Sequence, residues 1–247
     1  MAWQTPKTNW GAADGVRDSD FNRIEENIRL LHNGMAPRED ITLFVSPSGS
    51  DTTGTGSSSL PYATITKALL ALPKNFNGAN VSINIADGTY NETIVIRGYI
   101  GTLSLVGSFG STASINSITI DDSDVRIENI NIATSASPGF VVGGGATVAA
   151  TGNLVLSRYG INAFDNSKLL LANVEVYDAV TAVSVYNNAS LFMYQLYCSA
   201  INTGMNASNG GIITYSSMSG IVTGSRTVTS SGGRIYTGSQ TSGGAGV

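Results

Sequence analysis

Apolar residues recur every 22 positions from residue 81 onward. The step reaches Val81, Leu103, Val125, Thr147, Leu169, Leu191, Ile213 and Ile235, and only Thr147 is polar. A second column lies two residues further along, from Ile83 to Thr237. Residues two apart point to the same side of a strand, so each repeat is expected to contain a strand with one side in a common core.

A short turn precedes each of these strands and is rich in Asn, Asp, Ser and Gly. Examples are Asp165-Asn166-Ser167 and Asn187-Asn188-Ala189. Asn, Asp and Gly tolerate the left-handed backbone conformation that tight turns use. A 22-residue repeat of strand and turn, with no long helix between strands, is typical of a stacked parallel β-helix. The sequence therefore predicts an all-β, single-stranded parallel β-helix of about eight coils over residues 76–241, with a flexible tail at 242–247.

Residues 41–75 precede the repeat and are predicted to cap it. They comprise an apolar strand at Ile41–Val45, a polar loop, and an amphipathic helix from Thr64 to Leu72 that Pro73 ends. The end of a solenoid exposes unpaired backbone and apolar core. A short helix at this place would cover both.

Residues 1–40 carry most of the remaining helical signal and form a predicted attachment and oligomerisation segment. Four apolar residues at spacings of 3, 4 and 3 make a narrow stripe on one helix, which needs a partner because two heptads alone are marginal. That partner is either the same helix in neighbouring chains or the base of the adjacent domain. The two tryptophans favour docking onto another surface over stacking on a ligand. The attachment candidates are Trp3, Trp10, Phe21, Ile24, Ile28 and Leu31.

Composition excludes several classes of partner and site. The net charge is −4 and only 12% of residues are charged, so the chain lacks the basic field that binding to nucleic acid or an anionic membrane requires. The chain has no apolar run long enough to insert into a membrane. Its first residues do not resemble a secretion signal, and we expect it to be made in the cytoplasm and not exported. With one cysteine, Cys198, and one histidine, His32, we expect no disulfide, no metal site and no cofactor.

Two sets of predicted outward side chains are candidates for contacts. One is an apolar column between the inward columns, which predicts an inter-subunit stripe at Val148, Leu170 and Phe192. The other is a group of tyrosines, which either pack against another subunit or stack on sugar rings. The candidates for glycan contact are Tyr186, Tyr194 and Tyr197.

No catalytic residue is assigned from the sequence. Asp121 and Asp122 sit in the recurring turn, where Asn or Gly replaces them in other coils, so turn chemistry accounts for them. Asp121 and Asp165 would lie two coils apart, roughly 9.6 Å, which permits but does not indicate glycoside hydrolysis. The pattern leaves enzymatic activity open and favours a role without catalysis.

Three segments resemble the opening of the pectin-lyase-like superfamily: Phe44–Asp51, Leu60–Leu69 and Ile83–Glu92. The resemblance implies a right-handed β-helix with an N-terminal capping helix. It does not extend to the paired Gln and Asp with an Arg that pectinesterases use for catalysis, so it carries no catalytic residue to this chain.

The first segment, Trp3–Trp10 through Asp20–Ile28, is similar to the N-terminal region of tail, baseplate and fibre proteins of phages and prophages of Gram-positive bacteria. This resemblance implies a homotrimeric virion tail component that is joined to tail or baseplate proteins by its N-terminus. Its β-helix would face the host surface, where it would meet a receptor such as a cell-surface glycan. The alternatives are a tail spike depolymerase, either hydrolase or lyase, and a baseplate part without receptor contact.

Overall fold

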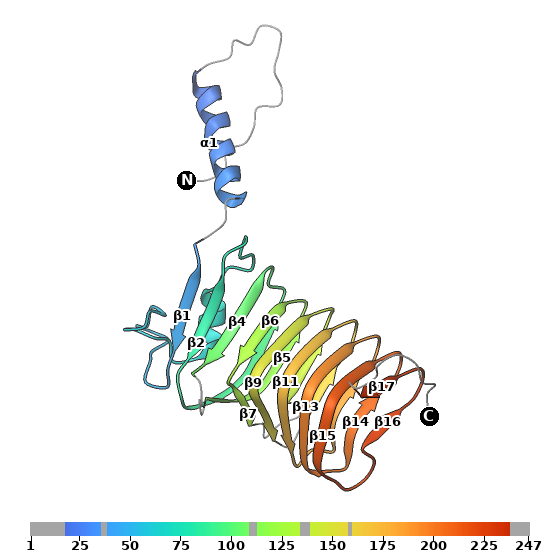
Figure 1. Ribbon diagram of the computed structural model, residues 1–247. Coiled ribbons are helices and arrows are strands. Elements are labelled where there is room, and N and C mark those ends of the chain that lie inside the picture. Colours follow the sequence, from blue (N-terminus) through green and yellow to red (C-terminus); the bar gives the residue numbers. More distant parts are fainter. Residues whose placement is uncertain (1–17, 36–38, 109–112, 134–138, 158–159, 238–247) are drawn as a thin grey trace, which may run out of the picture.

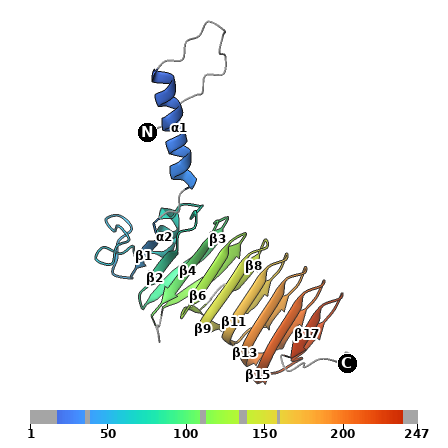
Figure 2. The same cartoon turned by 45° about the horizontal axis from the view of Figure 1, so that its top comes forward.

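A computed structural model describes residues 18–35, 39–108, 113–133, 139–157 and 160–237. Over these residues the chain forms a parallel β-solenoid with coils of about 22 residues and two helices, which confirms the predicted fold class (Figure 1). The coils stack one behind another, and the N-terminal helix α1 (Asp18–Met35) projects from one end of the stack (Figure 2).

Each coil has three faces, which follow one another along the chain. The first face is the longest stack, and its strands pair in parallel from the N-terminal to the C-terminal end. It consists of β1 (Ile41–Val45), β2 (Val81–Ile85), β4 (Thr102–Gly107), β6 (Asp124–Glu128), the beginnings of β9 (Thr147–Ser157), β11 (Lys168–Tyr177), β13 (Ser190–Ile201) and β15 (Ile212–Val222), and β17 (Arg234–Thr237).

The second and third faces complete each coil. The second face contains the beginnings of β3 (Thr89–Arg97) and β5 (Ser114–Asp121), then β7 (Asn131–Ala133) and the ends of β9, β11, β13 and β15. The third face contains the ends of β3 and β5, then β8 (Phe140–Gly143), β10 (Ile161–Ala163), β12 (Thr181–Val185), β14 (Thr203–Ala207) and β16 (Thr227–Thr229). Side chains from all three faces, such as Leu103, Val176 and Ile118, are buried inside the coil.

The solenoid has about six turns, fewer than the eight predicted from the core positions. The eighth predicted coil begins at β17, which is the last strand in the described residues and so is a single rung. Strand β1 is a further rung before the predicted eight, and it does not begin a complete turn either. After β1, a loop and the helix α2 (Ile65–Ala71) take the place of the other two faces, so that β1 pairs with β2 across 40 residues, Ile41 opposite Val81.

One coil departs from the 22-residue step and moves a predicted site residue. Val125 pairs with Val148 rather than Thr147, and Val148 in turn pairs with Leu169. From Val148 to Leu169 the step is 21 residues, which removes the offset. A separate β-bulge between Leu171 and Asn173 shifts the register of β11 against β9 once more. Val148 therefore points into the core with 0% of its surface exposed, and its prediction as part of an outward stripe is wrong.

The turn between the third face and the next first face has the predicted left-handed backbone. Positive φ angles occur at Asp165, Asn166, Asn187 and Asn188, at 52°, 61°, 52° and 61°. The side chains also connect successive coils, because Asn187 Nδ2 donates to Asp165 Oδ1 (2.9 Å) and Asn209 Nδ2 donates to Asn187 Oδ1 (3.4 Å). The turn thus bends the chain and bonds each coil to its neighbour.

Helix α2 closes the N-terminal end of the core, as predicted for Thr64 to Leu72. Ile65, Ala68 and Leu69 are its buried residues. Its N-terminal amides are satisfied by carboxylates from elsewhere in the chain: Glu92 accepts from the backbone amides of Ile65 (2.8 Å) and Thr66 (2.9 Å).

A second carboxylate, Asp51, ties the long loop before α2 to the start of this helix. Its Oδ1 accepts from the amides of Ala63 (2.8 Å) and Thr64 (3.1 Å), and its Oδ2 accepts from the Thr64 hydroxyl (2.7 Å). Burial raises the pKa of Asp51, but these hydrogen bonds and the charge of Lys67 outweigh it, and the net shift is downward. The ionised carboxylate therefore stabilises the cap.

Two replacements of Asn187 are expected to show separately how much stability comes from its left-handed backbone and how much from its side-chain hydrogen bonds to neighbouring coils. Asn187→Gly keeps the left-handed conformation accessible and removes the ladder bonds, whereas Asn187→Val also places a β-branched residue at positive φ. We expect both variants to melt at a lower temperature, and the valine variant to lose about 1 kcal/mol more stability than the glycine variant. Circular dichroism melting gives the order of the three melting temperatures. If both variants melted at the same temperature, the backbone requirement at residue 187 would be contradicted.

Acid is expected to weaken the cap through Asp51. Because its folded-state pKa lies below the ordinary value of 3.8, its stabilisation is present above that value and is lost as the pH falls through the folded-state pKa. Urea unfolding of the parent and of Asp51→Asn, from about pH 5 to about pH 2, measures this loss. The parent should lose stability more steeply than the variant. Parallel profiles would show that Asp51 does not hold the cap by its charge.

Candidate functional site

Helix α1 exposes the apolar side that the sequence singled out. Phe21, Ile24 and Ile28 are 57%, 47% and 58% exposed, whereas Asp20 and Asn27 are buried. In a surface helix the apolar side chains are usually buried and the polar ones exposed, and these residues of α1 show the reverse. Leu31 lies in the helix, but its side chain is outside the described residues, as are Trp3 and Trp10.

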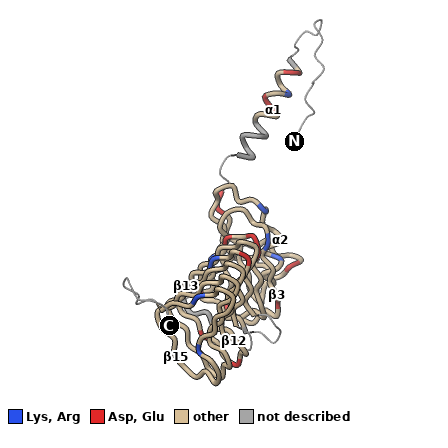
Figure 3. The backbone as a smooth tube through the Cα atoms, turned by 90° about the vertical axis from the view of Figure 1, so that its right-hand side faces the viewer, with Lys and Arg blue, Asp and Glu red and all other residues tan. Residues whose placement is uncertain are grey.

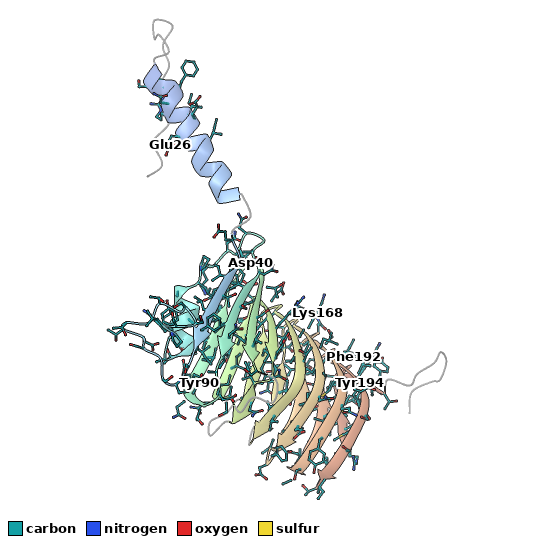
Figure 4. The ribbon with its side chains drawn as sticks, turned by 60° about the vertical axis from the view of Figure 1, so that its left-hand side comes forward. Glu26, Asp40, Tyr90, Lys168, Phe192 and Tyr194 are labelled. Carbon is teal, nitrogen blue, oxygen red and sulfur yellow. The ribbon has the colours of Figure 1, made fainter. Side chains whose placement is uncertain are left out.

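The first face carries an exposed apolar patch towards its C-terminal end. Leu170 and Phe192, both predicted to face outward, are 55% and 44% exposed and lie side by side on paired strands β11 and β13. Figure 4 shows Phe192 on the same side of the coils as Lys168 and Tyr194. Thr214 on β15 lies opposite Phe192 and separates it from Tyr236 on β17, and the exposed Ile212 lies two residues before Thr214 on the same side of β15.

The three predicted tyrosines do not form one cluster. Tyr186 follows β12 at the corner between the third and first faces, where its ring stacks on Phe164 (5.4 Å between centroids). Tyr194 lies in β13 beyond the first-face residues and is 57% exposed, and Tyr197 lies on the second face and is 42% exposed. Tyr186 is half-buried, so part of its ring is covered and is not available to a ligand.

The second face has a small hollow over strands β11, β13 and β15, with a volume of about 200 Å³. Three rungs contribute outward polar side chains in two rows across the strands. The first row is Asn173, Gln195 and Ser217, and the second row is Glu175, Tyr197 and Ser219. Val174 and Leu196 are buried between the rows and form the floor.

A pair of tyrosines and a carboxylate border this hollow. The Tyr177 hydroxyl donates to Glu175 Oε2 (2.6 Å), and the Tyr177 ring lies 6.0 Å from the Tyr197 ring at a tilt of 55°. The hydrogen bond to Glu175, with burial and the nearby negative charge, raises the pKa of Tyr177 to about 12. Tyr177 therefore keeps its proton at neutral pH and holds the carboxylate in place.

A larger groove of about 650 Å³ lies beside the cap. Its lining is uncharged and rich in hydroxyl groups, and it combines the loop before α2 with the ends of first-face strands. Two of these hydroxyls, those of Ser46 and Ser48, bond to each other (2.9 Å). The lining residues are Phe44, Val45, Ser46, Ser48, Ser58, Ser59, Pro61, Asn84, Ile85, Ala86, Val106, Gly107 and Ser108.

The aspartates considered for catalysis make structural contacts. Asp121 pairs with Arg97 (2.8 Å) across neighbouring coils, and Asp165 accepts from Asn187 in the turn ladder. Among the described residues there is no group of three or more His, Cys, Asp or Glu side chains that could hold a metal ion. In the same residues, no helix is both long and apolar enough to cross a membrane.

Cys198 lies in the core, in agreement with its interpretation as a small buried apolar residue. Its side chain is 0% exposed on the inward side of β13, and burial raises its pKa to about 11. A buried thiol that stays protonated is a poor nucleophile.

Comparison with known proteins gives one match. Residues 47–97 match the family model described as "Protein of unknown function (DUF1565)". Searches of curated proteins and of solved structures found no significant match. The chain is therefore a β-solenoid protein with a segment similar to DUF1565, and none of these comparisons names a phage tail protein.

The matched segment coincides with the cap and the first full coil. It contains both carboxylates that bind the start of α2, Asp51 and Glu92. It also contains Gly88, where an added Cβ atom would clash with the Pro47 ring. These residues serve folding and packing at the start of the solenoid.

Sequence reasoning found part of the second-face hollow. It recognised a polar column that contains Asn173, Gln195 and Ser217 and grouped Tyr177 with Tyr197, but it did not place Glu175 beside them. The signal was available, because Asn173, Glu175 and Tyr177 alternate with buried Val174 and Val176 and recur one coil later. Comparison of outward positions across all coils would have found the two rows.

Removal of the Glu175 charge is expected to lower the pKa of Tyr177. In Glu175→Gln the anionic acceptor is lost, so the pKa should fall from about 12 towards the ordinary value of 10. Tyrosinate absorbance during alkaline titration measures the shift, and subtraction of the Tyr177→Phe titration isolates this group. An unchanged titration curve would show that the 2.6 Å contact does not persist in solution.

Proposed function

We propose that the protein is a structural and adhesive component of a virion tail, such as a tail fibre, spike or baseplate protein of a phage or phage-derived particle. Its N-terminal segment attaches to tail or baseplate proteins, and its β-helix faces the host surface. In this proposal the protein is a homotrimer located in the virion tail. The observation that carries the proposal is helix α1, which leaves the capped end of the solenoid with its apolar side exposed (Figure 1).

The position of α1 supports attachment at one end of a rod. The helix precedes β1, which is the first rung, and α2 closes the core at that same end. An amphipathic helix with an exposed apolar side, on a short connection, can join other chains without disturbing the coils. The similarity of residues 3–28 to tail proteins points to the same end.

The surface of the solenoid supports a role in contact rather than in catalysis. Most of its backbone carries uncharged residues, with a few scattered acidic and basic positions (Figure 3). The candidate catalytic aspartates, Asp121 and Asp165, are held by Arg97 and Asn187. The apolar patch at Leu170 and Phe192 gives the trimer a second contact surface.

Charge placed on the exposed side of α1 is expected to dissociate the assembly. We expect the parent to have three times the 25.6 kDa mass of one chain in light scattering, and Ile24→Asp/Ile28→Asp to be a monomer. Two buried carboxylates in a helical interface would cost more than the interface provides. Antibody labelling of particles from the source strain should place the parent at the tail.

The control is Ser19→Asp/Asn22→Asp, which adds the same charge to exposed polar positions of the same helix. In light scattering this control variant should have the same mass as the parent assembly. A monomeric parent would overturn assembly through α1, and unlabelled tails would overturn the tail assignment. Shortening of a host glycan by the purified protein would instead favour a depolymerase.

A further inference from the structure

The second-face hollow has the composition of a site for a polar, uncharged ligand. Its rim offers two amides, two serine hydroxyls, one phenol and one carboxylate within three neighbouring rungs. Amides and hydroxyls both donate and accept hydrogen bonds, and each carboxylate oxygen accepts more than one. A ligand that presents several hydroxyl groups at close spacing matches this mixture.

Aromatic surface is available at the same place. Tyr197 is 42% exposed and sits in the middle rung, with the tilted ring of Tyr177 beside it. Aromatic rings pack on the apolar side of a flat ligand, while their hydroxyl groups remain in polar contacts. A sugar ring has such a C–H side and carries its hydroxyl groups around the edge, and a volume of about 200 Å³ is of that order of size.

Charge distinguishes between classes of glycan. Glu175 is the only charged residue in the lining, and its bond from Tyr177 keeps it at the rim as an acceptor. Arg226, whose guanidinium donates to the Gly220 carbonyl (3.3 Å), does not line the hollow. A carboxylate strengthens hydrogen bonds from neutral hydroxyls and repels uronic acids and phosphates.

The backbone of this face argues against an extended peptide. Strands β11, β13 and β15 already pair with one another along the second face, so no free edge is present there for an added strand. Val174 and Leu196 are the only apolar residues in the lining, and both are buried, so the hollow offers little apolar surface to a peptide side chain.

We propose that the hollow formed by Asn173, Glu175, Gln195, Tyr197, Ser217 and Ser219 binds one ring of a neutral glycan. Tyr197 packs against the ring, Glu175 and the two amides bond its hydroxyl groups, and Tyr177 positions Glu175. This proposal extends the proposed function, because the idea that the glycan lies on a host surface rests on the tail assignment. The hydrogen-bonding chemistry itself depends only on the hollow.

The test measures binding of the full-length protein to immobilised hexasaccharides. The neutral probes are N-acetylchitohexaose, cellohexaose and maltohexaose, and the anionic probe is hexagalacturonate. We expect the parent to bind at least one neutral probe and not the anionic one. Tyr197→Ala should weaken that binding about tenfold, which corresponds to the loss of one aromatic contact, and Gln195→Ala should weaken it to a similar extent.

Two further variants sharpen the result. Glu175→Gln keeps the shape of the side chain and removes its charge, so it should narrow the preference for neutral over anionic probes. Tyr236→Ala is the matched control, because Tyr236 is equally exposed (41% against 42%) but lies on the first face. It should bind like the parent, and thermal melting checks that each variant is folded.

The outcomes separate this inference from the proposed function. Failure to bind any neutral probe, or binding that Tyr197→Ala and Gln195→Ala leave unchanged, would overturn the glycan site even if antibodies label the tail. Binding that depends on Tyr197 together with unlabelled tails would support the site and overturn the tail assignment. Equal loss in Tyr236→Ala and Tyr197→Ala would also overturn the site, because the effect would not be specific to the hollow.

Discussion

Parallel pairing between successive coils is the constraint on which this structure depends. Each coil must return to the same register one strand spacing further along, about 4.8 Å, so that its amides and carbonyls meet those of its neighbours. The turn before each first-face strand makes this return possible in few residues. Asn and Asp adopt positive φ there, and Asn187 bonds to the coil before it while Asn209 bonds to Asn187.

The same constraint makes the two ends of the stack special. An end rung has unpaired backbone and an open core, and at the N-terminal end the chain uses α2 to cover them. Glu92 then accepts from the first two amides of that helix, and Asp51 accepts from the amides of Ala63 and Thr64 just before it. The segment 47–97 that matches the DUF1565 model contains this helix and both carboxylates.

Periodicity predicted the inside of the solenoid well and its outside less well. Inward positions must be apolar and must repeat, so a 22-residue step found the strands and the turns of the coils. The step failed at Val148, where an extra residue precedes β9 and the following step to Leu169 is one residue short. Thr147, the one polar member of the core column, was the sign of that slip. Of the two second-face rows, the sequence indicated the polar column with Asn173, Gln195 and Ser217 but not the row of Glu175, Tyr197 and Ser219. Outward positions have no common composition, and only pairing across β11, β13 and β15 brings the rows together.

Outward positions are also where function can vary without cost to the fold. A rung whose inward residues are fixed by packing still accepts almost any residue on its other side, so neighbouring rungs can assemble a grid of chosen chemistry at the strand spacing. On the first face this grid is apolar around Leu170 and Phe192, which suits contact with protein. On the second face it is polar around Tyr197 and Glu175, which suits contact with hydroxyl groups. Two faces of one coil can therefore hold an assembly together and meet a surface at the same time, because alternation keeps both tasks separate from the core.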